Sequence, residues 1–297
     1  MTDFDRGSEA TSSPSGELRD RGSEATSSPS GELRDIRIEA GDGGTATLHW
    51  NSSSGTDRLV EAGLIEAVRA IADEALAGQG LRRLEISLPA SDLAGRRAAL
   101  RAGFRLEGVR RQALQGPDGS YGDMAIFARL AADQVQGPSG FSGVMNSALP
   151  RKRLIAHVLM RDHGGRVLLC ETQFKSDWEL PGGIVEPYES PRLGAIREVH
   201  EELGISLDVG RLLVVDWMPP YLGWDDAIEM IFDGGIVEEI DLAAWSLQPT
   251  EIRSVRLCSL DEAAGLVTPL AHRRLALAAS LGPHEMAYTE DGRIYAS

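Results

Sequence analysis

The stretch from Gly183 to Ile205 constrains this chain more than any other, because it places three acidic side chains on one predicted helix. At about 100° per residue, spacings of three and four residues bring Glu198, Glu201 and Glu202 onto one helix face. The opposite face carries the apolar positions of a normal buried stripe, Leu193, Ile196, Val199 and Leu203. Carboxylates this close together favour a bound cation, and oxygen ligands suit Mg²⁺ or Mn²⁺. The alternative is an acidic helix face that is simply solvated.

The ends of this helix are also marked in the sequence. Ser190 is a good N-cap residue, and Pro191 suits the first helical turn, where its missing N–H costs nothing. Gly204 favours the left-handed conformation that ends a helix. Upstream, Pro181-Gly182-Gly183 predicts a tight turn that leaves a strand. The local order expected here is therefore strand, loop, helix and loop.

The spacing of residues across the stretch resembles the Nudix box. Gly183 is followed after five residues by Glu189, and after seven more by Arg197 to Ile205, which read Arg-Glu-Val-His-Glu-Glu-Leu-Gly-Ile. The resemblance implies a Nudix fold over residues 151–297, a mixed sheet sandwiched between helices in an α/β/α arrangement. It also implies Mg²⁺-dependent cleavage of a pyrophosphate bond in a nucleoside diphosphate derivative by water attack at phosphorus, with Mn²⁺ as the alternative metal.

The same resemblance assigns roles to residues of the box. It implies four metal ligands, namely the carboxylates of Glu198, Glu201 and Glu202 and the backbone carbonyl of Gly183. Arg197 is expected beside them, where its rigid guanidinium would orient a neighbouring carboxylate for catalysis.

The general base has three candidates. Glu201 or Glu202 would serve if a metal-bound water lies nearby. Glu251, in Gln248-Pro-Thr-Glu-Ile252, resembles the family's downstream Glu-Ile element and is predicted as a further catalytic or metal residue. The alternative for Glu251 is a cap that points into solvent. Because neighbouring carboxylates titrate together, no single proton is assigned to one of them.

Substrate choice is predicted from an aromatic segment outside the box. Trp217, Tyr221 and Trp224 lie close together in a chain that is only 5% aromatic. Such rings stack on a nucleobase, which always presents a π face, so the three residues are candidate substrate contacts. The competing interpretation is a hydrophobic loop packed on its own domain or on a dimer partner.

Charge and cysteine content limit the partners. The chain has 30 Lys plus Arg against 45 Asp plus Glu, a net charge of −15, which argues against a nucleic-acid polymer or an anionic membrane as its partner. Two cysteines, Cys170 and Cys258, favour reduced thiols over a disulfide framework. With no apolar run of bilayer length and no apolar signal core, we expect a cytoplasmic protein. Its predicted partner is a nucleoside diphosphate-linked small molecule, and the resemblance allows a homodimer.

The chain outside the box predicts three further regions. Residues 6–20 recur unchanged as residues 21–35, a polar repeat with too little apolar surface to fold, so 1–35 is predicted to be disordered. Residues 36–130 alternate strand and helix patterns as in an α/β domain. Residues 131–150 are polar and contain Gly137-Pro138-Ser-Gly, which predicts an interdomain linker.

Residues 36–130 resemble the carboxyl half of a GNAT-type acetyltransferase. The resemblance rests on the segment from Ala102 to Gly108, followed by Asp123. The family's acyl-CoA pyrophosphate loop would fall at Asn51–Leu59, which lacks the glycine pair that lets backbone amides approach phosphate. We therefore expect a partial, degenerate domain. A working acetyltransferase, a small-ligand or regulatory module and a structural or dimerising remnant are its three interpretations.

Together these patterns predict a Nudix pyrophosphohydrolase joined to a partial GNAT-like domain. Two other functions stay open at this point. One is a non-catalytic nucleotide sensor built on a Nudix scaffold, and the other is a bifunctional protein with a residual acetyl-CoA-binding module.

Overall fold

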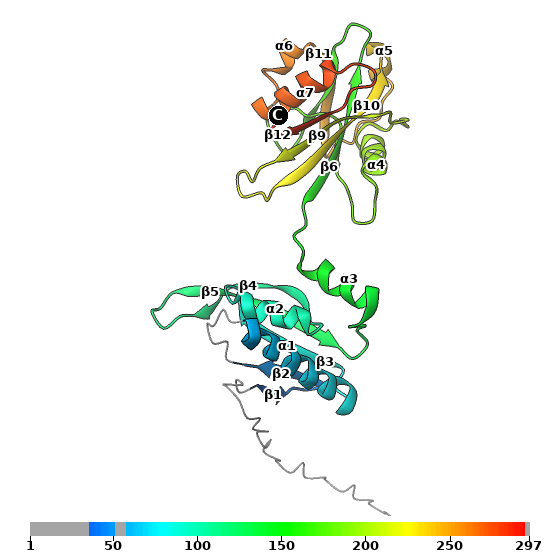
Figure 1. The fold of residues 1–297 in the computed structure, drawn as a ribbon. Coiled ribbons are helices and arrows are strands. Elements are labelled where there is room, and N and C mark those ends of the chain that lie inside the picture. The colour runs from blue at the N-terminus through cyan, green and yellow to red at the C-terminus, as the bar shows by residue number, and fades with distance from the viewer. Residues whose placement is uncertain (1–35, 51–57, 295–297) are drawn as a thin grey trace, which may run out of the picture. The chain divides into compact units, whose positions relative to one another are not determined.

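The computed structural model describes residues 36–50 and 58–294 (Figure 1). The tandem repeat at 6–35 and most of the predicted 51–59 loop lie outside the described residues. The chain divides into two compact units, with the boundary between Leu149 and Pro150. Within the described ranges, no helix is both long and apolar enough to cross a bilayer.

The first unit is a five-stranded sheet in the order β1-β2-β3-β5-β4, with helices packed on it. Strands β2 and β3 are parallel and are joined through α1, whereas β3, β5 and β4 pair antiparallel. Its elements are β1 (Arg37–Ala40), β2 (Thr45–His49), α1 (Arg58–Asp73), which continues as the π-helical turn η1 (Glu74–Gly78), β3 (Arg83–Pro89), α2 (Leu93–Arg101), β4 (Arg105–Gln115), β5 (Tyr121–Leu130) and α3 (Gly137–Ala148). The described part of residues 36–130 contains both strands and helices, as the predicted alternation requires.

The predicted linker at 131–150 is wrong in part, because it contains α3. The Ser147 hydroxyl of this helix accepts a hydrogen bond from the Leu106 backbone N–H of β4 at 3.0 Å. Gly140 lies so close to Val135 that an added Cβ would meet the Val135 carbonyl carbon at 2.5 Å. Glycine at this position permits close packing of α3 on the chain before it. The composition of residues 131–150 alone suggested a flexible connector.

The second unit is a mixed sheet in the order β11-β7-β6-β10-β9-β12, with β8 paired to β6. Strands β6 and β10 run parallel at its centre, and β12 runs parallel to β9 at one edge. Its elements are β6 (Arg153–Arg161), β7 (Val167–Thr172), β8 (Gly182–Ile184), α4 (Pro191–Leu203), β9 (Leu212–Met218), β10 (Ala227–Ile236), α5 (Glu239–Leu242), β11 (Ile252–Cys258), α6 (Leu260–Ala263), α7 (Pro269–Ser280) and β12 (Ala287–Glu290).

Helices α4 and α7 cover opposite faces of this sheet (Figure 1). Val199 and Leu203 of α4 are fully buried in one apolar cluster with Val158 of β6. Leu275 of α7 packs in a second cluster with Leu159, the next residue of the same strand. Because neighbouring strand residues point to opposite faces, β6 contributes to both clusters. The predicted sandwich of a mixed sheet between helices is thus confirmed for this unit.

Candidate active site

Helix α4 begins and ends where its capping residues require. The Ser190 hydroxyl accepts a hydrogen bond from the Leu193 backbone N–H, and Pro191 occupies the first turn. Gly204 ends the helix at φ +69°, a conformation that a side chain would disfavour. These caps fix which carboxylates face β8.

Arg197 binds three glutamates at once. Its guanidinium donates to both carboxylate oxygens of Glu189, at 3.0 and 3.1 Å, and its Nη1 donates to Glu198 at 2.9 Å and Glu201 at 3.0 Å. It also donates to the Ile184 carbonyl at 3.1 Å, which connects α4 to β8. The hydrogen bonds from Arg197 lower the pKa of Glu189. The predicted orienting role of Arg197 fits this geometry.

Glu202 has the most perturbed carboxylate of the box. It is 9% exposed, and its Oε2 accepts a hydrogen bond from the Gly182 backbone N–H at 2.9 Å. Burial raises its pKa to about 7, and the charges of Glu198 and Glu179 act in the same direction. A carboxylate with a pKa near neutral can release or accept a proton at the operating pH of most enzymes.

Glu198 lies against the backbone of Gly183. A Cβ added at Gly183 would meet the Glu198 carboxyl carbon at 2.8 Å, so only glycine leaves room for this carboxylate. Burial raises the pKa of Glu198, and the charges of Glu201 and Glu251 contribute in the same direction. Glu251 lies in the turn before β11 and is exposed. Its charge is nevertheless one of those that raise the pKa of Glu198. The catalytic or metal-binding role of Glu251 therefore stays a prediction.

These residues suit a divalent metal in chemistry but are not arranged around one as they stand. Over residues 36–50 and 58–294, no three His, Cys, Asp or Glu side chains are grouped closely enough to hold an ion. In this arrangement Arg197 holds Glu198 and Glu201, and the Gly182 amide holds Glu202. The donor set is nonetheless oxygen-only, and its buried carboxylates with raised pKa values favour a nearby cation.

Of the predicted substrate contacts, Tyr221 and Trp224 lie on the loop between β9 and β10, and Trp217 lies near the end of β9. Tyr221 is 72% exposed and Trp224 is 63% exposed. The Arg153 guanidinium lies 4.6 Å from the centre of the Trp224 ring. Trp217 is partly buried and donates its indole N–H to Asp226 at 3.1 Å. Two exposed rings at a loop tip match the stacking interpretation and the packing interpretation equally, so substrate binding by these residues stays a prediction.

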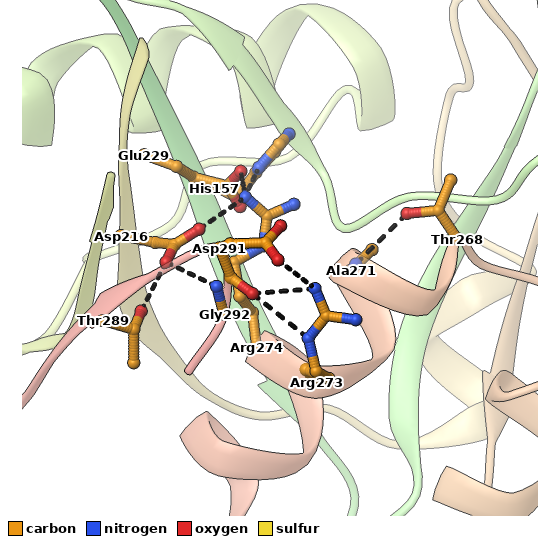
Figure 2. A network of polar contacts seen from close by, with 10 residues as sticks. All are labelled: His157, Asp216, Glu229, Thr268, Ala271, Arg273, Arg274, Thr289, Asp291 and Gly292. Carbon is orange, nitrogen blue, oxygen red and sulfur yellow. Dashed lines mark hydrogen bonds and ion pairs between the residues drawn. The ribbon is translucent and has the colours of Figure 1, made fainter. Parts of the chain in front are cut away.

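A buried polar network on the α7 face of the sheet was not predicted (Figure 2). His157 Nδ1 lies 3.0 Å from Glu229 Oε1, and Arg274 contacts Glu229 and, at 3.4 Å, Asp216. Asp216 also accepts hydrogen bonds from the Thr289 hydroxyl at 2.6 Å and from the Gly292 backbone N–H at 2.8 Å. One signal was visible in the sequence: polar residues interrupt the apolar runs of β6 and β10 at inward-facing positions.

The charges in this network balance one another. Although burial opposes it, the positive charges of Arg274 and His157 lower the pKa of Glu229. Burial likewise works against the protonated form of His157, and the neighbouring Glu229 outweighs it and raises the pKa of the imidazole. An ionised carboxylate only accepts hydrogen bonds, so the proton of the His157–Glu229 bond belongs to Nδ1. A small cavity of about 30 Å³, lined in part by His157, Glu179, Glu229 and Arg274, lies beside the network.

Comparison with known proteins identifies the second unit. Residues 151–280 match the family model described as the NUDIX domain. The chain is 34% identical over 117 residues to the CMP-5'-(N-acetyl-N-hydroxy-3-aminopropyl)phosphonate hydrolase of Streptomyces rubellomurinus, an alignment that covers 38% of this chain and 54% of that protein. It is 44% identical over 61 residues to the CTP pyrophosphohydrolase of Escherichia coli, over 19% of this chain and 44% of that one. The chain thus spans about half the length of each.

One solved structure of another family also aligns with part of the chain. A GNAT-family acetyltransferase from Bacillus anthracis aligns with 17% identity and a TM-score of 0.30, over 34% of this chain and 59% of that one. A similarity of this size carries no conclusion about residues 36–130, whose GNAT-like character stays a prediction.

For the second unit, the matched family, the box spacing and the sandwich architecture agree. Residues 151–280 of this chain belong to the Nudix family.

Proposed function

We propose that this chain is a Mg²⁺-dependent hydrolase that cleaves a pyrophosphate bond in a nucleoside diphosphate derivative. The observation that carries the proposal is Glu202, a buried carboxylate with a pKa near 7 beside Glu198, within a domain of the Nudix family. Burying like charges side by side is costly for a purely structural helix face, and it is common where a site needs them.

Four groups would hold the metal, namely the carboxylates of Glu198, Glu201 and Glu202 and the carbonyl of Gly183. When bound, a divalent ion of this kind neutralises phosphate charge and makes water a better nucleophile. The protein's own part is preorganisation. Arg197 restrains the carboxylates of Glu198 and Glu201, and the Gly182 amide restrains Glu202. Glu202, Glu201 and Glu251 are the three candidates for accepting the proton of the attacking water.

The proposed substrate class follows from the relatives. One similar protein is named for a CMP-linked phosphonate and another for CTP, so cytidine nucleotides are the first compounds to test. The exposed rings of Tyr221 and Trp224 and the partly buried ring of Trp217 are proposed to stack on the base.

The test is a substrate panel with Mg²⁺ that includes CTP, other nucleoside triphosphates and nucleotide sugars. We expect release of a nucleoside monophosphate by the full chain and a loss of about a hundredfold or more in Glu202→Gln, the size typical of removing a proton-transfer group. Asp261→Asn, which changes an exposed carboxylate on α6, is the matched control and should keep full activity. Nucleotide binding without any product would contradict the proposal and favour a sensor.

A further inference from the structure

The buried network on the α7 face lies directly behind the backbone that holds Glu202. Gly182 of β8 and His157 of β6 are register partners in the sheet. The Val158 backbone N–H donates to the Pro181 carbonyl at 2.9 Å at the same place. The segment that ends at Gly182 is therefore attached to β6 at the residue that carries the imidazole.

The imidazole ring of His157 also lies close to the Gly182 backbone. A Cβ added at Gly182 would meet His157 Cα at 2.7 Å and the ring carbon Cδ2 at 3.0 Å. The imidazole thus limits the space next to the Gly182 backbone. On its other side, the same Gly182 donates its N–H to Glu202 Oε2 at 2.9 Å. We therefore expect a shift of the ring to move the amide that orients this carboxylate.

The ring in turn is fixed by charges at both ends of the network. Nδ1–H donates to Glu229, which is 3% exposed and is held by Arg274. Arg274 also contacts Asp216, which is fully buried and anchored by Thr289 and Gly292. Figure 2 shows this row of side chains between the central strands and α7. A hydrogen-bonded ion network in a poorly hydrated interior has few alternative arrangements, so it holds the imidazole in one orientation.

We propose that His157 is a positioning residue for Glu202: held by Glu229 and Arg274, its ring fixes the Gly182 backbone and thereby the carboxylate of Glu202. The inference rests on the proposed function for its catalytic consequence, but its structural consequence can be measured without substrate or metal. A residue that only stabilised the fold would affect β8 no more than other buried residues of this unit do.

The test uses His157→Leu in the full chain and two measurements. The first is hydrogen exchange of the peptide that contains Gly182–Ile184, without nucleotide or metal. We expect exchange there to be roughly tenfold faster, because a backbone amide that loses its support opens more often. The second is turnover on the best substrate with Mg²⁺. We expect kcat to fall roughly ten- to a hundredfold with KM within about twofold, the pattern of a misplaced catalytic group.

Val167→Ala is the matched control, because it removes buried apolar contacts of β7 in the same half of the core without touching the network. It should lower the unfolding midpoint while Gly182 exchange and kcat stay within about twofold of the unmodified protein. If His157→Leu does not fold, His157→Asn takes its place, since it keeps a donor for Glu229 and removes the ring edge that meets Gly182. The same acceleration of exchange is expected.

Two results would overturn the inference. One is unchanged exchange at Gly182–Ile184 in the folded His157 variant. The other is a Val167→Ala protein in which exchange and kcat change as much as in His157→Leu, which would mean general loss of stability. A chain with no hydrolytic activity on any substrate would defeat the proposed function, and the exchange measurement would still decide whether His157 positions β8.

Discussion

Removal of the Asp216 carboxylate should destabilise the second unit more than any surface substitution. Asp216 has no exposed surface, and its Oδ1 accepts from both the Thr289 hydroxyl and the Gly292 amide. Asp216→Ala leaves these two buried donors without an acceptor, at about 1–3 kcal/mol each, and removes one of the two partners of Arg274. Breaking a buried ion pair on one side costs about 3–5 kcal/mol. Even at the lower end of each range these losses sum to about 5 kcal/mol, so we expect the free energy of unfolding to fall by about that amount.

Asp216→Asn separates the two contributions. Its amide oxygen can still accept from Thr289 and Gly292, and only the longer contact to Arg274, at 3.4 Å, is lost. The expected loss is about 1–2 kcal/mol. Urea unfolding followed by tryptophan fluorescence measures both, since four of the five tryptophans, Trp178, Trp217, Trp224 and Trp245, lie in the second unit. The reasoning is refuted if Asp216→Ala loses less than about 1 kcal/mol, or if Asp216→Asn loses as much as Asp216→Ala.

Two further substitutions test other parts of the structure. Gly182→Ala places a side chain at φ +129°, with its Cβ 2.7 Å from His157 Cα. The substitution should lower the free energy of unfolding by about 3 kcal/mol, which corresponds to a drop of about 6–12 °C in Tm. An unchanged Tm would contradict this expectation. In the first unit, Arg83 donates to both oxygens of Glu107, and these hydrogen bonds lower the pKa of Glu107. The pair therefore stabilises the folded state fully at pH values above the ordinary glutamate pKa of about 4.3, and this stabilisation is lost as the pH falls through the lowered pKa. Because Glu107 is 44% exposed, Glu107→Gln should cost only about 0.5–1 kcal/mol at pH 7 in urea unfolding, and the difference should vanish at acid pH; a difference that persists there would point to packing instead.

The parts of the site that depend on local sequence could be predicted. Helix α4, its Ser190 cap and its Gly204 end follow from neighbouring residues, as do the carboxylates that share a face with Arg197. The two apolar faces of β6 likewise follow from alternation along one strand.

What could not be predicted depends on which strands become neighbours. His157, Asp216, Glu229 and Arg274 are separated by up to 117 positions, and only the sheet order and the placement of α7 bring them together. The hydrogen-bond partners of the carboxylates could not be predicted either. Sequence spacing shows that the carboxylates share a helix face, but it does not show that the Gly182 amide donates to Glu202. Helix α3 was missed for a different reason, because its glycines serve close packing and not flexibility.

The strand β12 has a practical consequence for anyone who cuts this chain into pieces. The family match ends at residue 280, yet β12 at Ala287–Glu290 completes the sheet beyond that boundary. A fragment cut at 280 would leave the hydrogen-bonding edge of β9 open to pairing with other molecules. It would also delete Thr289 and Gly292, the two donors that satisfy the buried Asp216. Expression of the catalytic unit by itself should therefore extend through residue 294, since a shorter piece invites aggregation for reasons unrelated to its active site.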